Sequence, residues 1–316
     1  MALASTIKSF TQSPARFLLR KSVRAIRFLE SQLPPSVFGL IAWPAATIWA
    51  LLEFKTDRRA LTAWSRIPSQ WRPRRLIYLF RQTIGFAHAR LVYLWPDRLT
   101  QPRWLNRCRL EANYDLQNLL KADRPIIFVS LHFGPFRTLP YWLRAHGIPS
   151  TTLIGSPVSP QSAWIDRHSA PADVPVLMSV SEMREIRRSL AGNRRLLILT
   201  DVGRGKLVPV PFGNQTFWMA TGAARLAASS GALLVPCLIV QEKASWNFAI
   251  HFGSPVPDEY LLGTPNLEAA SIHIFHEMLP VAEKHPEQCR HRMLNCISAS
   301  VMETSQSPTS LVPSLS

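Results

Sequence analysis

The sequence predicts an α/β fold in which helices flank a mixed central sheet, with a hydrophobic and basic helical region at the N-terminus. Two observations predict this. Short apolar runs alternate with helical patterns from residue 125 onward, and the positive charge is concentrated before residue 110. Buried strands that alternate with helices are typical of α/β proteins, whose reactive groups lie just beyond the carboxyl ends of the strands.

The N-terminal third carries nearly all of the excess charge. Residues 1–110 hold 19 basic and 4 acidic side chains, and the net charge of all 316 residues is +16. Residues 1–33 predict a basic amphipathic arm, because their apolar residues recur at helical spacing. Residues 34–54 predict a hydrophobic membrane anchor. As a helix, its apolar part would span only about 24 Å and would contain Pro44, so a membrane span, an in-plane anchor and a buried helix all stay open.

Composition narrows the class of protein further. A hydrophobic content of 47% excludes a disordered polycation. Six of the 10 Trp lie in the same Arg-rich third, a combination typical of membrane interfaces and of single-stranded nucleic-acid binders alike. Four Cys without a Cys-x-x-Cys motif make no disulfide framework, which favours a reduced, cytosol-facing environment.

Apolar periodicity predicts the elements in order. Residues 55–122 are Arg-rich and patterned like helices, including 76–95 and 103–120. Strands are predicted at 125–131, 150–154, 174–180, 195–200, 232–240 and 248–252. Helices are predicted at 136–146, 181–190 and 221–230, with one or two more between 266 and 299. We therefore expect an α/β domain over residues 55–300 and a disordered, Ser- and Pro-containing tail over 301–316.

Two polar residues that follow predicted strands are the candidates for chemistry. His132 comes directly after the 125–131 strand and before Gly134, at a turn, where an imidazole could remove a proton from a hydroxyl that attacks a carbonyl. Asp201 ends the 195–200 strand and could orient a His or cap a turn. Arg204 and Lys206 follow it and could bind a phosphate or the pantetheine arm of a carrier, or form a solvated loop.

Other chemical motifs are missing from the sequence. It contains no Gly-x-Ser-x-Gly elbow, no phosphate-binding Gly-rich loop and no dinucleotide fingerprint. His285, Cys289, His291 and Cys296 lie close together, but their spacing matches no standard zinc site. We expect these four residues to belong to a closing helix, and we expect neither a metal nor a cofactor.

Several blocks occur in order over residues 34–300: RLVYLWPDRL, SLHFGPFRTLPYWLRAHGIPSTTLIG, DVGRGKLVPVPFGNQTFWMATGAARLAASSGALLVPCLIV and a terminal HPEQ. Together they resemble the bacterial late lipid A acyltransferases, which are lysophospholipid-acyltransferase-like proteins. The resemblance implies a cofactor-independent enzyme at the cytoplasmic face of the bacterial inner membrane. It would move a fatty acyl chain from acyl carrier protein or a coenzyme A thioester to a hydroxyl of a lipid or glycolipid, such as a lipid A precursor. Anionic membrane lipid then becomes the expected partner of the basic third, in place of nucleic acid.

The sequence departs from that family at one position. The family's motif is His, four residues, then Asp or Glu, and the carboxylate stabilises the charged His. Here the motif is HFGPFR, so Arg137 stands where the acid would be. A cation cannot stabilise an imidazolium ion. Three outcomes stay open: another carboxylate serves His132 (Asp201 first, Glu185 second), His132 acts alone, or the protein binds lipid or acyl carrier without turnover.

The remaining site residues are expected to bind substrate. The expected anion contacts are Arg137, Arg204 and Lys206. The glycines expected to let the backbone approach the substrate are Gly134, Gly203 and Gly213. Backbone N–H groups after His132 are the expected donors to the oxyanion of the tetrahedral intermediate.

Overall fold

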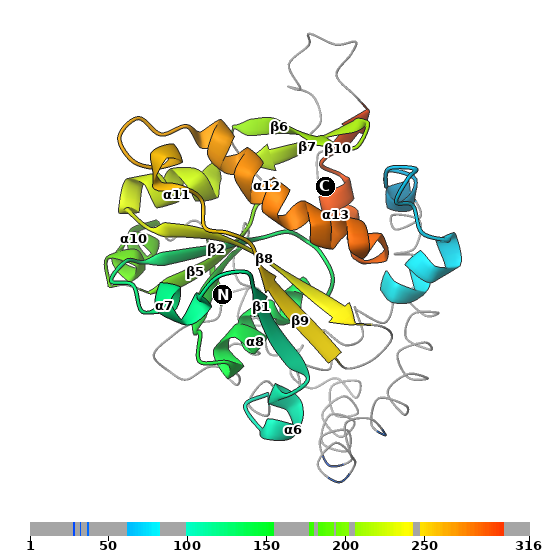
Figure 1. The fold of residues 1–316 in the computed structure, drawn as a ribbon, viewed down its shortest axis with the longest axis horizontal. Coiled ribbons are helices and arrows are strands. Elements are labelled where there is room, and N and C mark those ends of the chain that lie inside the picture. The colour runs from blue at the N-terminus through cyan, green and yellow to red at the C-terminus, as the bar shows by residue number, and fades with distance from the viewer. Residues whose placement is uncertain are drawn as a thin grey trace, which may run out of the picture.

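A mixed seven-stranded sheet is the centre of the fold (Figure 1), in the order β1-β9-β8-β2-β5-β3-β4. The computed structural model describes residues 28, 32, 37, 62–82, 99–154, 177–179, 183–192, 194–201, 206–242 and 247–299. The strands of this sheet are β1 (Cys108–Ala112), β2 (Ile126–Ser130), β3 (Ser150–Ile154), β4 (Leu177–Ser179), β5 (Arg195–Leu199), β8 (Leu233–Glu242) and β9 (Asn247–Phe252). All neighbouring pairs are parallel except β8 and β9, so the predicted mixed α/β sheet is confirmed.

Helices cover both faces of this sheet because its central strands are apolar on both sides. All five residues of β2 are buried: Ile127 and Val129 join one core, and Ile126 and Phe128 join the other. The first core is closed by α10 (Met183–Ala191), α11 (Gly222–Ser230) and α12 (Leu267–Lys284). The second is closed by α6 (Pro102–Leu105), α7 (Leu116–Leu120) and α8 (Leu139–Ala145). The predicted strands and helices from residue 125 to 252 thus lie where the apolar pattern put them, within a few residues.

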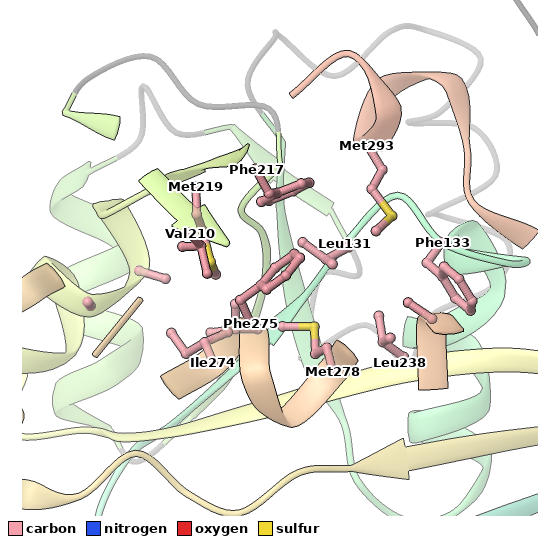
Figure 2. Close-up of a cluster of buried hydrophobic side chains, with 14 of the residues drawn as sticks. Leu131, Phe133, Val210, Phe217, Met219, Leu238, Ile274, Phe275, Met278 and Met293 are labelled. Atoms are coloured by element: carbon pink, nitrogen blue, oxygen red, sulfur yellow. The ribbon is translucent and has the colours of Figure 1, made fainter. Parts of the chain in front are cut away.

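A small antiparallel sheet, which the sequence did not predict, packs against α12. It consists of β6 (Leu207–Phe212), β7 (Gln215–Ala220) and β10 (Ile297–Ala299). The sequence did not predict β6, because it contains Pro209 and Pro211, which are rare inside strands. However, β6 is an edge strand, where the missing N–H of a proline is tolerated. Figure 2 shows the core beneath it, in which the rings of Phe217 and Phe275 stack with centroids 4.6 Å apart.

Two other element predictions are corrected. The stretch 103–120 was predicted to be helical, but β1 interrupts it between α6 and α7 and pairs with β9 at the sheet edge. Its Arg109 and Glu111 reach solvent, as suits an edge strand. The closing region ends in β10 rather than in a helix: α12 stops at Lys284, and η5 (Pro286–Gln288) and α13 (His291–Leu294) follow.

The predicted N-terminal segments fall almost wholly outside the described residues, as does the 301–316 tail. Of the 76–95 helix, residues 75–82 are described and are helical. Among the residues that the structure describes, no helix is long and apolar enough to cross a bilayer.

Candidate active site

His132 and Asp201 are in direct contact, although 69 positions separate them in the chain. His132 Nδ1 lies 2.7 Å from Asp201 Oδ1, and the backbone N–H of His132 donates to Asp201 Oδ2, also at 2.7 Å. His132 is 5% exposed and Asp201 is 1% exposed. One carboxylate therefore fixes both the ring and the backbone of the histidine.

The sheet brings these two residues together. β2 and β5 are parallel neighbours, and Ser130 at the end of β2 faces Leu199 at the end of β5. The residues that follow each strand must then lie side by side at the carboxyl edge of the sheet. Leu131 and Phe133, which precede and follow His132 in the chain, are buried in the core that Figure 2 shows, so apolar packing holds the turn in place.

The contact also decides how the imidazole can act. An ionised carboxylate only accepts hydrogen bonds, so Nδ1 carries a hydrogen, and in the neutral imidazole the lone pair is then on Nε2. Among the described residues, none binds Nε2. The ring of Phe136 meets the imidazole edge-on, with centroids 4.5 Å apart. The arrangement supplies a proton acceptor at Nε2, and the contact between Nδ1 and Asp201 fixes the orientation of the ring.

Gly134 is confined by its surroundings. Its φ angle is +52°, and a Cβ added there would lie 2.3 Å from the carbonyl oxygen of Ile239 in β8. No residue with a side chain fits without moving the backbone of β8. The turn after His132 therefore passes so close to β8 that there is no room for a Cβ at position 134.

The backbone N–H groups of residues 133 to 136, which come first among the expected oxyanion donors, are not free to bind an oxyanion. The N–H of Phe133 donates to Leu131 O at 2.7 Å, that of Gly134 to Gln288 O at 2.8 Å, and that of Phe136 to Phe133 O at 3.1 Å. Pro135 has no N–H. Every backbone donor from 133 to 136 is thus absent or used inside the protein.

The other predicted site residues make no hydrogen bond with the His132–Asp201 pair in the described part of the chain. Arg137 is exposed, with its guanidinium carbon 5.8 Å from the Phe136 ring centroid. Lys206 is exposed, and its carbonyl oxygen accepts from Thr221. Gly213 lies in the β6–β7 turn, where its neighbours are Gln70 and Pro68. Gly203 and Arg204 lie outside the described residues. Glu185, the second candidate partner of His132, instead pairs with Arg188 on α10.

Sequence analysis missed Arg290, Gln288 and Gln82, which hold the turn from its other side. Arg290 Nε donates to Gly134 O at 2.9 Å, and its Nη1 donates to Gln82 O at 2.8 Å. The sequence predicts only that the HPEQ block before Arg290 belongs to a closing helix. No local pattern could have shown that this arginine reaches the turn of a residue 156 positions away.

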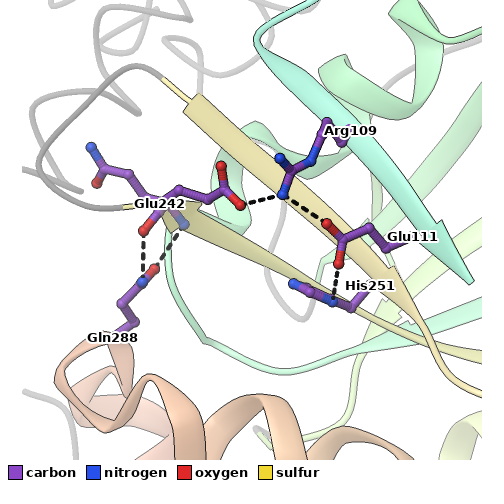
Figure 3. Close-up of polar contacts among 6 residues, drawn as sticks. Arg109, Glu111, Glu242, His251 and Gln288 are labelled. Carbon is purple, nitrogen blue, oxygen red and sulfur yellow. Dashed lines mark hydrogen bonds and ion pairs between the residues drawn. The ribbon is translucent and has the colours of Figure 1, made fainter.

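A second polar cluster lies at the β1–β9 edge of the sheet (Figure 3). His251 Nδ1 is 3.1 Å from Glu111 Oε2, and Arg109 bridges Glu111 and Glu242. Burial lowers the pKa of His251. A pocket of about 420 Å³ opens beside this cluster, lined in part by Glu277. Among the described residues, no three His, Cys, Asp or Glu side chains lie close enough together to hold a metal ion.

Comparison with known proteins adds little. No family model matches the chain, and no curated protein matches it. The fold is similar to the crystal structure of the 1-acyl-sn-glycerophosphate acyltransferase PlsC from Thermotoga maritima, with a TM-score of 0.40 and 11% identity over 80% of this chain and 98% of that chain.

Proposed function

We propose that the protein is a membrane-associated acyltransferase that moves a fatty acyl chain from an acyl thioester to a hydroxyl of a lipid or glycolipid acceptor. The observation that carries the proposal is the 2.7 Å contact between His132 Nδ1 and Asp201 Oδ1. The blocks that resemble the late lipid A acyltransferases leave this chain without an acid at position 137. Asp201 supplies one from a neighbouring strand.

The geometry supports a general-base mechanism. Nε2 of His132 takes the proton of the acceptor hydroxyl as its oxygen attacks the thioester carbonyl, and Asp201 stabilises the imidazolium that forms. The tetrahedral intermediate then breaks its C–S bond. The thiolate leaves with the proton that Nε2 received, and the new ester remains on the acceptor.

Charge around the turn favours anionic substrates. Arg137 is exposed and lies three residues beyond Gly134 in the chain. Acyl carrier protein, coenzyme A and phosphorylated lipids all carry negative charge that such cations attract. The acceptor and the carrier follow from the resemblance, and anionic lipid of the cytoplasmic face of the inner membrane is the matching partner of the basic N-terminal third.

The test is release of free thiol from acyl-acyl carrier protein and from acyl coenzyme A, with lysophosphatidic acid or a lipid A precursor as acceptor. We expect His132→Ala and Asp201→Asn each to lower kcat by about 10³-fold or more, since both the base and its tautomer depend on this pair. Glu185→Gln is the matched control, because it removes a carboxylate that pairs with Arg188 on α10.

Equal turnover by the wild type and both dyad variants would contradict the mechanism. A wild type that binds acyl carrier or anionic vesicles without releasing thiol would favour the alternative, a family member that has kept binding and lost turnover.

A further inference from the structure

The segment that follows α12 binds the turn of the candidate active site along its length. The N–H of Gly134 donates to Gln288 O at 2.8 Å, and the N–H of Arg290 donates to His132 O at 3.1 Å. On its other side the Gln288 amide pairs with the main chain of Gln241 in β8, at 2.9 and 3.0 Å (Figure 3). This segment therefore ties the His132 turn to the sheet.

The guanidinium of Arg290 extends the same connection. Its Nε donates to Gly134 O at 2.9 Å, and its Nη1 donates to the backbone O and the Oε1 of Gln82, at 2.8 and 2.7 Å. Gln82 in turn donates to Cys289 O at 2.8 Å. The arginine thus joins three parts of the chain: the turn, the segment after α12 and the helical residues 75–82.

Arg290 is an unusual choice for this place in the protein. Its side chain is mostly buried, and no carboxylate oxygen of the described residues lies within 4.0 Å of it. Burial lowers its pKa to about 10, so it still carries its charge at neutral pH. An apolar side chain would avoid the desolvation of that charge. What the arginine supplies instead is a fixed set of donors to two carbonyl groups and one amide.

We propose that Arg290 is a positioning residue of the active site, which holds the His132–Gly134 turn in its working geometry through the carbonyl of Gly134. This rests on the proposed function. Asp201 fixes the imidazole and the backbone N–H of His132 from one side, and Arg290 fixes the carbonyl end of the same turn from the other. Without the guanidinium, the turn loses the hydrogen bond to the Gly134 carbonyl and keeps the contacts of Asp201 and the main-chain bonds to Gln288 and Arg290.

The proposal predicts a particular kinetic signature. A shift of about 1 Å in a reacting group lowers the rate by roughly 100-fold. Since Arg290 acts through the turn rather than on the substrate, its loss should lower kcat by about 10- to 100-fold and leave KM for the acyl thioester within about twofold.

Two substitutions test this in opposite ways. Arg290→Ala leaves a space that added guanidinium ion can occupy, whereas Arg290→Met fills the same space with an apolar chain. We expect millimolar guanidinium chloride to restore part of the kcat of the alanine variant and none of the kcat of the methionine variant. Rates are normalised to folded protein, measured by circular dichroism and thermal unfolding.

Arg72→Met is the matched control. Arg72 also donates only to carbonyl groups, those of Ile67 and Ser65, and it makes no hydrogen bond with the His132 turn. We expect it to lower stability and to keep the wild-type kcat per folded molecule.

The results separate this proposal from the proposed function. Wild-type kcat in folded Arg290→Met, or an equal loss of kcat in Arg72→Met, would overturn the role of Arg290 alone, provided that His132→Ala is inactive. If His132→Ala is as active as the wild type, the acyltransferase mechanism itself fails.

Discussion

Replacing Gly134 by alanine should damage the fold far more than the same change at Gly147. Both glycines have positive φ, +52° and +75°, a region that costs an L-residue about 1–2 kcal/mol. At Gly147 the new methyl group would meet nothing within 4 Å. At Gly134 it would meet the carbonyl oxygen of Ile239 at 2.3 Å, where ordinary contact begins at 3.4 Å.

Relieving that contact must move the turn or β8 by about 1 Å, which strains the hydrogen bonds of Gly134 to Gln288 and Arg290. Each such bond contributes about 0.5–1.5 kcal/mol. We therefore expect Gly134→Ala to lower the free energy of unfolding by about 2–5 kcal/mol, which is about 1–3 kcal/mol more than the roughly 1–2 kcal/mol expected for Gly147→Ala. Urea denaturation followed by Trp fluorescence measures both. Losses that agree within about 0.5 kcal/mol would show that the close approach of β8 does not constrain the turn.

Three further predictions concern charge. Burial raises the pKa of three cysteine thiols, namely Cys108, Cys237 and Cys289. Above about pH 8.5 the unfolded chain loses these protons and the folded chain keeps them, so the free energy of unfolding should fall by roughly 1.4 kcal/mol per pH unit for each thiol. Urea unfolding at pH 8 and pH 10 measures this fall. An equal free energy of unfolding at the two pH values would refute the prediction. Arg137→Glu places a carboxylate five positions after His132, yet we expect no rise in kcat in the thiol-release assay, because Asp201 already binds Nδ1. A rise would mean that a carboxylate at position 137 can serve His132. Arg124 and Asp258 form a partly exposed ion pair, with two N–O distances of 2.8 and 3.0 Å. Asp258→Asn should therefore lower the free energy of unfolding by at most about 1 kcal/mol. In thermal unfolding, 1 M NaCl should remove the difference between the variant and the wild type.

The central strands are the easiest elements to predict from the sequence. β2 is buried throughout and β5 holds four consecutive apolar residues, so a local pattern reveals them, and the residue that follows each can be placed at the same edge. The same pattern makes Asp201 the first candidate partner of His132. In the structure, one carboxylate oxygen of Asp201 contacts the ring of His132 and the other accepts its backbone N–H.

The elements that were missed depend on neighbours far away in the chain. β1 reads as polar because Arg109 and Glu111 face solvent, and only its pairing with β9 makes it a strand. β6 reads as a loop because of its prolines, and only β7 shows it to be an edge strand. Arg290 could not be placed because a hydrogen bond from one side chain leaves no periodic trace in a sequence.

The origin of the dyad from two strands has a consequence for folding. In a His-x4-acid motif the base and its acid belong to one short turn, which local contacts can form early. Here the pair exists only after β2 and β5 have docked, a contact between residues 69 positions apart that carries the entropy of closing a long loop. Any partly folded form in which β5 has not joined β2 lacks the dyad. The His132–Asp201 contact would then report directly on the pairing of the central strands.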